Sequence, residues 1–190
     1  KEDTAQSFTL GGPIIKDKAF FYVTYEETTV TNPVLYGPAG SGAANEQAIT
    51  LAQVDNIRQI TINKYGWDPL GVASTTESNQ ENTSLRVDYI LNENHRLTYN
   101  YKSTEGDRLR ASGSNSSFYF ESASYFKGEK TDTSSILLVS DWSDNLVSEI
   151  YYSNKSTDTS QESPAGQNVP NFYIDDAYGM RVYLGADIYR

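Results

Sequence analysis

The chain has 190 residues, 13% of them aromatic, and it contains 15 tyrosines, a single methionine and no cysteine. Its formal net charge of -10 disfavours nucleic acid as a partner, because phosphate binding needs clustered lysine and arginine, and the missing cysteine excludes disulfides and thiolate metal sites. No apolar run approaches the roughly 18 residues that a membrane-spanning helix needs. A transmembrane β-barrel stays compatible with the mean hydropathy of -0.58, because its apolar residues alternate with polar ones along each strand.

The first predicted elements are two strands, residues 5–12 and 19–30, joined by the polar turn Lys16-Asp17-Lys18. Pro13 has no backbone N–H for a ladder and belongs at a strand end, and the residues after the turn are strongly β-prone. Alternation places Phe8 and Leu10 on one face of the first strand. In the second strand it separates two sets, Phe21, Val23 and Tyr25 on one face and Phe20, Tyr22, Thr24 and Glu26 on the other.

A long insertion, residues 31–81, follows the second strand and begins with a Gly/Ala/Ser-rich stretch. Within it, residues 46–65 have helical character, with Gly66 at the C-terminal stop. Four apolar residues recur at helical spacing: Ile49, Ala52, Ile57 and Ile60. We expect a loop helix with one face packed on the protein, and a partner-binding helix is the alternative. The polar residues 74–82 are expected to end the insertion.

The clearest alternation lies in a hairpin whose first strand covers residues 83–91 and whose turn is Asn92-Glu93-Asn94-His95. One face carries the apolar and aromatic residues Leu85, Val87, Tyr89, Leu91, Leu97, Tyr99 and Tyr101. The other face carries charged residues, Arg86, Asp88, Arg96 and Lys102. If the apolar face contacts lipid, these four charged residues face a barrel lumen and are the candidate ligand-binding residues.

A second loop, residues 105–130, leads to two further strands, residues 133–142 and 146–157, around the turn Ser143-Asp144-Asn145. Their predicted apolar faces are Ile136, Leu138 and Trp142, and Leu146, Ile150 and Tyr152. A third polar stretch, residues 158–178, precedes another extended segment from Met180 to Tyr189. Short turns thus alternate strictly with long loops, an asymmetry typical of bacterial outer-membrane barrels, whose long loops are extracellular.

Three stretches resemble the TonB-dependent outer-membrane receptors, in particular their Oar-like branch: GGPIIKDKAFFYVTYEE from Gly11, YGWDP from Tyr65 and LRVDYILNENHRLTY from Leu85. The resemblance implies an all-β fold, six to seven antiparallel strands of a transmembrane barrel of about 22 strands. Residues 1–190 would be part of that barrel domain, without its N-terminal plug, first strand and C-terminal strands. The implied function is energised uptake of a bulky ligand across the outer membrane. The implied partners are membrane lipid, TonB acting through the plug, and a surface lipoprotein or larger outer-membrane complex.

The residues suggest no enzyme, no cofactor and no metal site. His95 is the single histidine, and with Ser143 and Asp144 it makes no triad on spacing. Asp68, Asp175, Asp176 and Asp187 could supply oxygens to Ca²⁺, but without an EF-hand spacing we expect solvated loop acids. Two other functions stay open. One is a structural or adhesion barrel without transport, and the other is a soluble all-β carbohydrate-binding module with exposed aromatic platforms.

Overall fold

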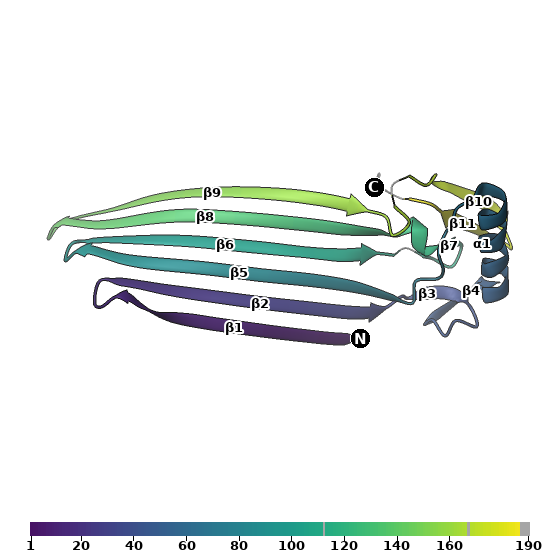
Figure 1. Cartoon of the computed structure of the whole chain (residues 1–190), viewed down its shortest axis with the longest axis horizontal. Coiled ribbons are helices and arrows are strands. Elements are labelled where there is room, and N and C mark those ends of the chain that lie inside the picture. The colour runs from purple at the N-terminus through teal and green to yellow at the C-terminus, as the bar shows by residue number, and fades with distance from the viewer. Residues whose placement is uncertain (112, 167, 187–190) are drawn as a thin grey trace.

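The computed structural model describes residues 1–111, 113–166 and 168–186, and in this part of the chain the protein is an all-β, mostly antiparallel structure with one α-helix. Its main feature is a long six-stranded sheet with the order β1-β2-β5-β6-β8-β9 (Figure 1). The strands of this sheet are β1 (Glu2–Ile15), β2 (Ala19–Pro33), β5 (Thr75–Asn92), β6 (His95–Arg110), β8 (Tyr125–Ser143) and β9 (Leu146–Glu162). The predicted all-β class is confirmed. The sheet does not close on itself, because β1 and β9 are its two edges.

The three tight turns of the sheet lie together at one end, and the long connections lie at the other (Figure 1). In the first turn Asp17 has the left-handed φ of 58°, and the Lys18 N–H donates to the Ile15 carbonyl at 3.1 Å. In the second turn the Asn94 N–H donates to the Asn92 side-chain oxygen at 2.9 Å. The predicted alternation of short turns and long loops is therefore confirmed.

The strands extend further from the tight turns than predicted. Residues 74–82 were expected to end the insertion, but from Thr75 onward they belong to β5. Likewise, much of the predicted loop 105–130 is strand, in β6 and β8. In these extensions the backbone ladder continues with few apolar residues, such as the paired Leu109 and Phe126. Side-chain hydrogen bonds support it, for example Thr29 to Asn79 at 3.0 Å and Thr104 to Asn82 at 2.9 Å. Apolar periodicity marks only the half of each strand that is nearest the tight turn, which is why the extensions were missed.

The long connections build a separate compact unit, the cap, beyond the far end of the sheet (Figure 1). It contains β3 (Tyr36–Ala39), β4 (Asn45–Thr50), α1 (Leu51–Tyr65), β7 (Ser117–Tyr119), the 3-10 helix η1 (Glu121–Ala123), β10 (Phe172–Ala177) and β11 (Met180–Leu184). Its buried core draws on all three connections: Ile49, Val54, Ile57, Phe118, Phe120, Met180, Val182 and Leu184. The extended segment expected from Met180 onward is therefore a cap strand, because β11 pairs with β10 and β7. The end of that segment, residues 187–189, lies outside the described residues.

Helix α1 begins five residues later than predicted, at Leu51. Thr50 and Gln53 form a reciprocal capping box, and Gly66 ends the helix in the left-handed conformation with φ of 76°, as predicted. The predicted buried face is wrong: the buried helix residues are Val54, Ile57 and Thr61. Of the residues expected on that face, only Ile57 is buried within the helix; Ala52 and Ile60 are exposed, and Ile49 is buried but lies in β4. The expectation of a helix packed on the protein is confirmed.

Candidate functional site

The cross-strand register joins the apolar faces predicted strand by strand into one continuous surface. Directly paired positions form rows across all six strands, and one row consists of Gly12, Phe21, Val87, Tyr99, Ile136 and Tyr152. The flanking rows contain Leu10, Val23, Leu85 and Tyr101 on one side and Ala19, Tyr89, Leu97, Leu138 and Ile150 on the other. We call this surface the belt and its side of the sheet the belt face. The predicted strand faces are confirmed.

The belt is apolar, and apart from the buried Ala19 its residues are half-buried or exposed. Ile150 is 62% exposed, Trp142 at the turn end of the belt 60% and Phe8 at its other end 57%. In each strand the belt covers about seven residues, for example residues 19–25 of β2, which at roughly 3.4 Å per residue spans about 20 Å. The three central rows of the belt carry no charged side chain, and the row at its far end, which begins with Phe8 and Tyr25, carries one, Asp132. Because the buried core lies in the cap, no other layer of the described chain covers this surface.

The four predicted lumen residues all lie on the opposite face of the sheet. Arg86 and Asp88 form a bidentate pair, with Arg86 Nε donating to Asp88 Oδ2 at 2.7 Å and Nη2 to Oδ1 at 2.8 Å. Thr98 from the neighbouring strand also donates to Asp88 Oδ1, at 2.7 Å. Arg96 lies two residues before Thr98 on β6, whereas Lys102 lies further along, paired in register with Ser84. The structure thus brings Arg86 and Asp88 into contact and leaves Lys102 apart from them.

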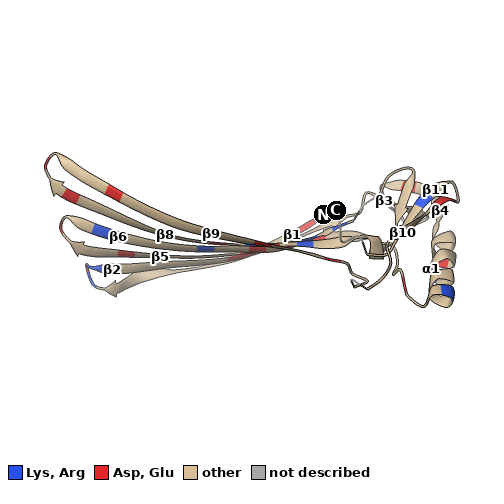
Figure 2. Cartoon of the chain, turned by 90° about the horizontal axis from the view of Figure 1, so that it is seen from above, with Lys and Arg blue, Asp and Glu red and all other residues tan. Residues whose placement is uncertain are grey.

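Positive charge is unevenly divided between the two faces of the sheet. Figure 2 shows both signs of charge along the strands, so the uneven division appears only when the faces are separated by register. Seven of the eight lysines and arginines in the six strands lie on the opposite face: Arg86, Arg96, Lys102, Arg108, Arg110, Lys127 and Lys155. The eighth, Lys130, lies on the belt face beyond the belt, in a row with Glu27, Glu81, Glu105 and Asp158. Lys130 Nζ contacts Glu105 at 2.8 Å.

Sequence reasoning missed most of the opposite-face cations. Arg108, Arg110 and Lys127 fell inside the predicted loop 105–130, and Lys155 was placed in a strand without a role. A signal was present, because Lys102, Arg108 and Arg110 keep the even spacing of one strand face. These cations recur at even spacing on one strand face beyond the region where apolar residues alternate regularly on the other face.

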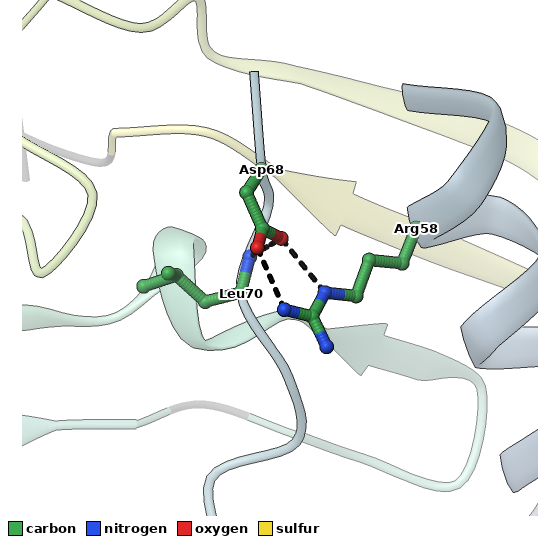
Figure 3. A network of polar contacts seen from close by, with 3 residues as sticks. All are labelled: Arg58, Asp68 and Leu70. Carbon is green, nitrogen blue, oxygen red and sulfur yellow. Dashed lines mark hydrogen bonds and ion pairs between the residues drawn. The ribbon is translucent and has the colours of Figure 1, made fainter. Parts of the chain in front are cut away.

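An ion pair in the cap joins α1 to the segment that follows it (Figure 3). Arg58 donates from Nε and Nη2 to the two oxygens of Asp68, at 2.8 and 2.6 Å. The Leu70 N–H also donates to Asp68 Oδ1 at 2.8 Å, which fits the left-handed φ of 67° at Leu70. These hydrogen bonds, led by those from Arg58, lower the pKa of Asp68 below its ordinary value.

The acids considered for Ca²⁺ do not converge in the described part of the chain. Asp68 binds Arg58, and Asp175 contacts Arg181 at 2.6 Å. No group of three or more potential metal ligands occurs among the described residues, and Asp187 lies outside them. His95 lies at the start of β6 with its ring 5.0 Å from that of Trp142, so its contact is aromatic.

None of the described helices is long and apolar enough to cross a membrane. Comparison of the chain with protein-family models, with curated proteins and with solved structures finds no match.

Proposed function

We propose that the six-stranded sheet is part of the wall of an outer-membrane β-barrel, with the belt in contact with lipid. The observation that carries this proposal is the belt itself, a half-buried to exposed surface that extends across all six strands and whose three central rows carry no charge. Soluble proteins rarely expose an apolar surface of this extent. Its height of about 20 Å approaches the apolar band of roughly 25 Å on bacterial barrels.

The free edges of the sheet support the same proposal. β1 and β9 each have one side without a paired strand in the described chain. In lipid every unpaired backbone group costs several kcal/mol, so we propose that further strands pair with both edges and close the barrel. In that arrangement the opposite face, with Arg86, Asp88, Arg96 and Lys102, lines the lumen. The cap then lies at the extracellular mouth, because the tight turns of such barrels are periplasmic.

We further propose that this barrel is a receptor for energised uptake of a bulky ligand. The support is the resemblance of residues 11–27 to a signature of TonB-dependent receptors, which in this fold covers the end of β1, the first turn and the aromatic start of β2. TonB and a plug would supply the energy coupling, outside the sheet described above. A structural or adhesion barrel would have the same wall of strands as a receptor, but it would not require TonB.

The two tryptophans of the sequence provide a direct test of lipid contact. Trp142 lies at the turn end of the belt and is 60% exposed, whereas Trp67 packs against the cap core. In the Trp67→Phe variant the fluorescence of these 190 residues comes from Trp142, and in the Trp142→Phe variant it comes from Trp67. After reconstitution of the full protein into bilayers with acyl chains brominated near the headgroup, we expect strong quenching of Trp142 and little quenching of Trp67. Quenching of Trp142 no stronger than that of Trp67 would contradict the proposal and favour a soluble all-β module.

A further inference from the structure

A cluster of three cations lies on the opposite face of the sheet, near the cap. Arg108 on β6 is paired in register with Lys127 on β8, and Arg110 lies two residues further along β6 on the same face. All three side chains are exposed. They line a groove of about 290 Å³ that also contains Gly106, Glu129 and several hydroxyl and amide side chains. We call these three residues the cation cluster.

The groove depends on the missing side chain of Gly106. A Cβ at this position would lie 2.9 Å from the carbonyl oxygen of Asn79, closer than real Cβ contacts allow. Gly106 lies in the row next to Arg108 and Lys127 and faces the same side of the sheet. The floor of the groove is therefore bare backbone, and a ligand can approach it closely.

Sheet stability does not explain the cation cluster. Like charges placed directly opposite each other on neighbouring strands destabilise a sheet. Within the described part of the chain no ion pair involves Arg108, Arg110 or Lys127. Of the acids that line the groove, Glu129 shares its face, whereas Asp107 belongs by alternation to the belt face. Three cations thus face one carboxylate in a chain whose net charge is -10.

We propose that the cation cluster binds a multivalent oxyanion, such as a phosphorylated or polycarboxylated ligand group. Two guanidinium groups offer paired N–H donors that match such oxygens, and Lys127 adds a compact charge. Because the cluster lies on the face opposite the belt, a lipid headgroup beside the belt does not reach it. The placement in a barrel lumen near its extracellular mouth rests on the proposed function. The anion binding itself rests only on the groove and its charges.

Inorganic tripolyphosphate is a suitable probe, measured by calorimetry on the full protein in a nonionic detergent at low salt. We expect saturable binding that weakens as salt is added. Arg108→Gln/Lys127→Gln should weaken it at least about tenfold, since both changes remove charge-assisted hydrogen bonds to the oxyanion. The matched control is Lys16→Gln/Lys18→Gln, which removes two cations from the turn at the distant end of the sheet. This control should bind tripolyphosphate as the unmodified protein does.

Thermal unfolding provides a second readout. Removing the facing charges should leave the melting temperature of Arg108→Gln/Lys127→Gln unchanged or higher, because it relieves repulsion. Cations that stabilised the sheet would give the opposite result, a lower melting temperature when they are removed. The inference would be overturned if the unmodified protein did not bind tripolyphosphate, or if both double variants lost binding equally. It would also be overturned if the cluster variant had a lower melting temperature. Binding that persists when Trp142 is not quenched by brominated lipid would overturn only the proposed membrane function.

Discussion

A single residue step along a strand of the sheet reverses the surroundings of a side chain. Asp88 is held by Arg86 and Thr98 through three charge-assisted hydrogen bonds. Its neighbour Val87 points to the other face, in a row with Phe21 and Tyr99. Neighbouring residues of a strand therefore lie on two chemically different faces, and substitutions at adjacent positions should have different consequences.

The neighbouring residues Thr9 and Leu10 provide a matched comparison at this scale. Both are exposed in edge strand β1, and only Leu10 belongs to the belt. If the belt contacts lipid, Leu10→Arg should cost about 2–4 kcal/mol of membrane-protein stability, because a charge then lies near the bilayer midplane. Thr9→Arg should cost far less, because its side chain points to the polar face. Unfolding titrations of the two variants in lipid bilayers measure the difference.

The same pair distinguishes lipid from water as the solvent of the belt. In water an exposed Leu→Arg change at an edge strand has little effect on stability. Equal stability of the two variants in bilayers would therefore mean that the belt does not face lipid. A greater loss for Thr9→Arg would mean that the two faces of the sheet are exchanged.

The elements of the sheet show why sequence reasoning succeeded in one half of each strand. Between the tight turns and residues such as Tyr25 and Tyr101, apolar side chains alternate with polar ones, and this period fixed the faces and the turns. Further from the turns, most side chains on both faces are polar, as where Glu81 pairs with Glu105. The ladder there depends on backbone groups, which every sequence provides, so the even spacing of cations such as Lys102, Arg108 and Arg110 was the remaining sign of a strand.

Helix α1 shows a different limit. Its Gly66 stop was predictable, because a left-handed terminal residue favours glycine. Its buried face was not, because Ile49 ends the preceding strand and Thr50 starts the helix, so counting from Ile49 set the wrong phase. The pair between Arg58 and Asp68 was likewise invisible, because it joins the helix to a loop whose path only the fold determines.

That ion pair predicts how cap stability depends on pH. The pKa of Asp68 is lowered in the folded protein, so its contribution is complete above the unfolded pKa of about 3.9 and is lost as the pH falls through the folded value. We therefore expect Asp68→Asn to lower cap stability at pH 6 and to have a smaller effect at pH 3. The loss should be modest, because the Asp68 side chain is 38% exposed.

The emission of Trp67, measured in a Trp142→Phe background, reports unfolding of the cap. Asp144→Asn is the control. This substitution removes the same formal charge, but in the distant turn between β8 and β9. An equal effect of Asp68→Asn at pH 6 and pH 3 would show that the carboxylate contributes no pH-dependent stability to the cap.

At the scale of the whole molecule, the protein divides into two parts stabilised in different ways. The cap has a buried core, in which Ile49, Phe118 and Val182 come from three separate connections. The sheet has no such core and exposes its belt. The sequence showed the sheet, whose contacts are between consecutive strands. It did not show the cap, because nothing in the local pattern of residues 31–81 indicates a partner more than a hundred residues away.

This division predicts that damage to the cap core stays in the cap. Phe120 is completely buried, packs edge-on against Phe118 with ring centroids 5.2 Å apart, and donates its N–H to the Tyr183 carbonyl at 3.0 Å. Phe120→Ala should cost the cap about 3–5 kcal/mol, because it opens a cavity in a small core. The hairpin of β5 and β6 near its turn should be unaffected, because its ladder and its belt residues lie far from the cap (Figure 1).

Hydrogen exchange followed by mass spectrometry on the full protein separates the two responses. Deuterium uptake in Phe120→Ala should rise in peptides from α1 and β11, while peptides from residues 85–101 keep their slow exchange. The control is Phe126→Ala, at the start of β8, where the same side chain is 37% exposed and its removal leaves no buried cavity. If residues 85–101 lose protection together with the cap, sheet and cap unfold as one cooperative unit. In that case the cap contributes to the stability of the sheet.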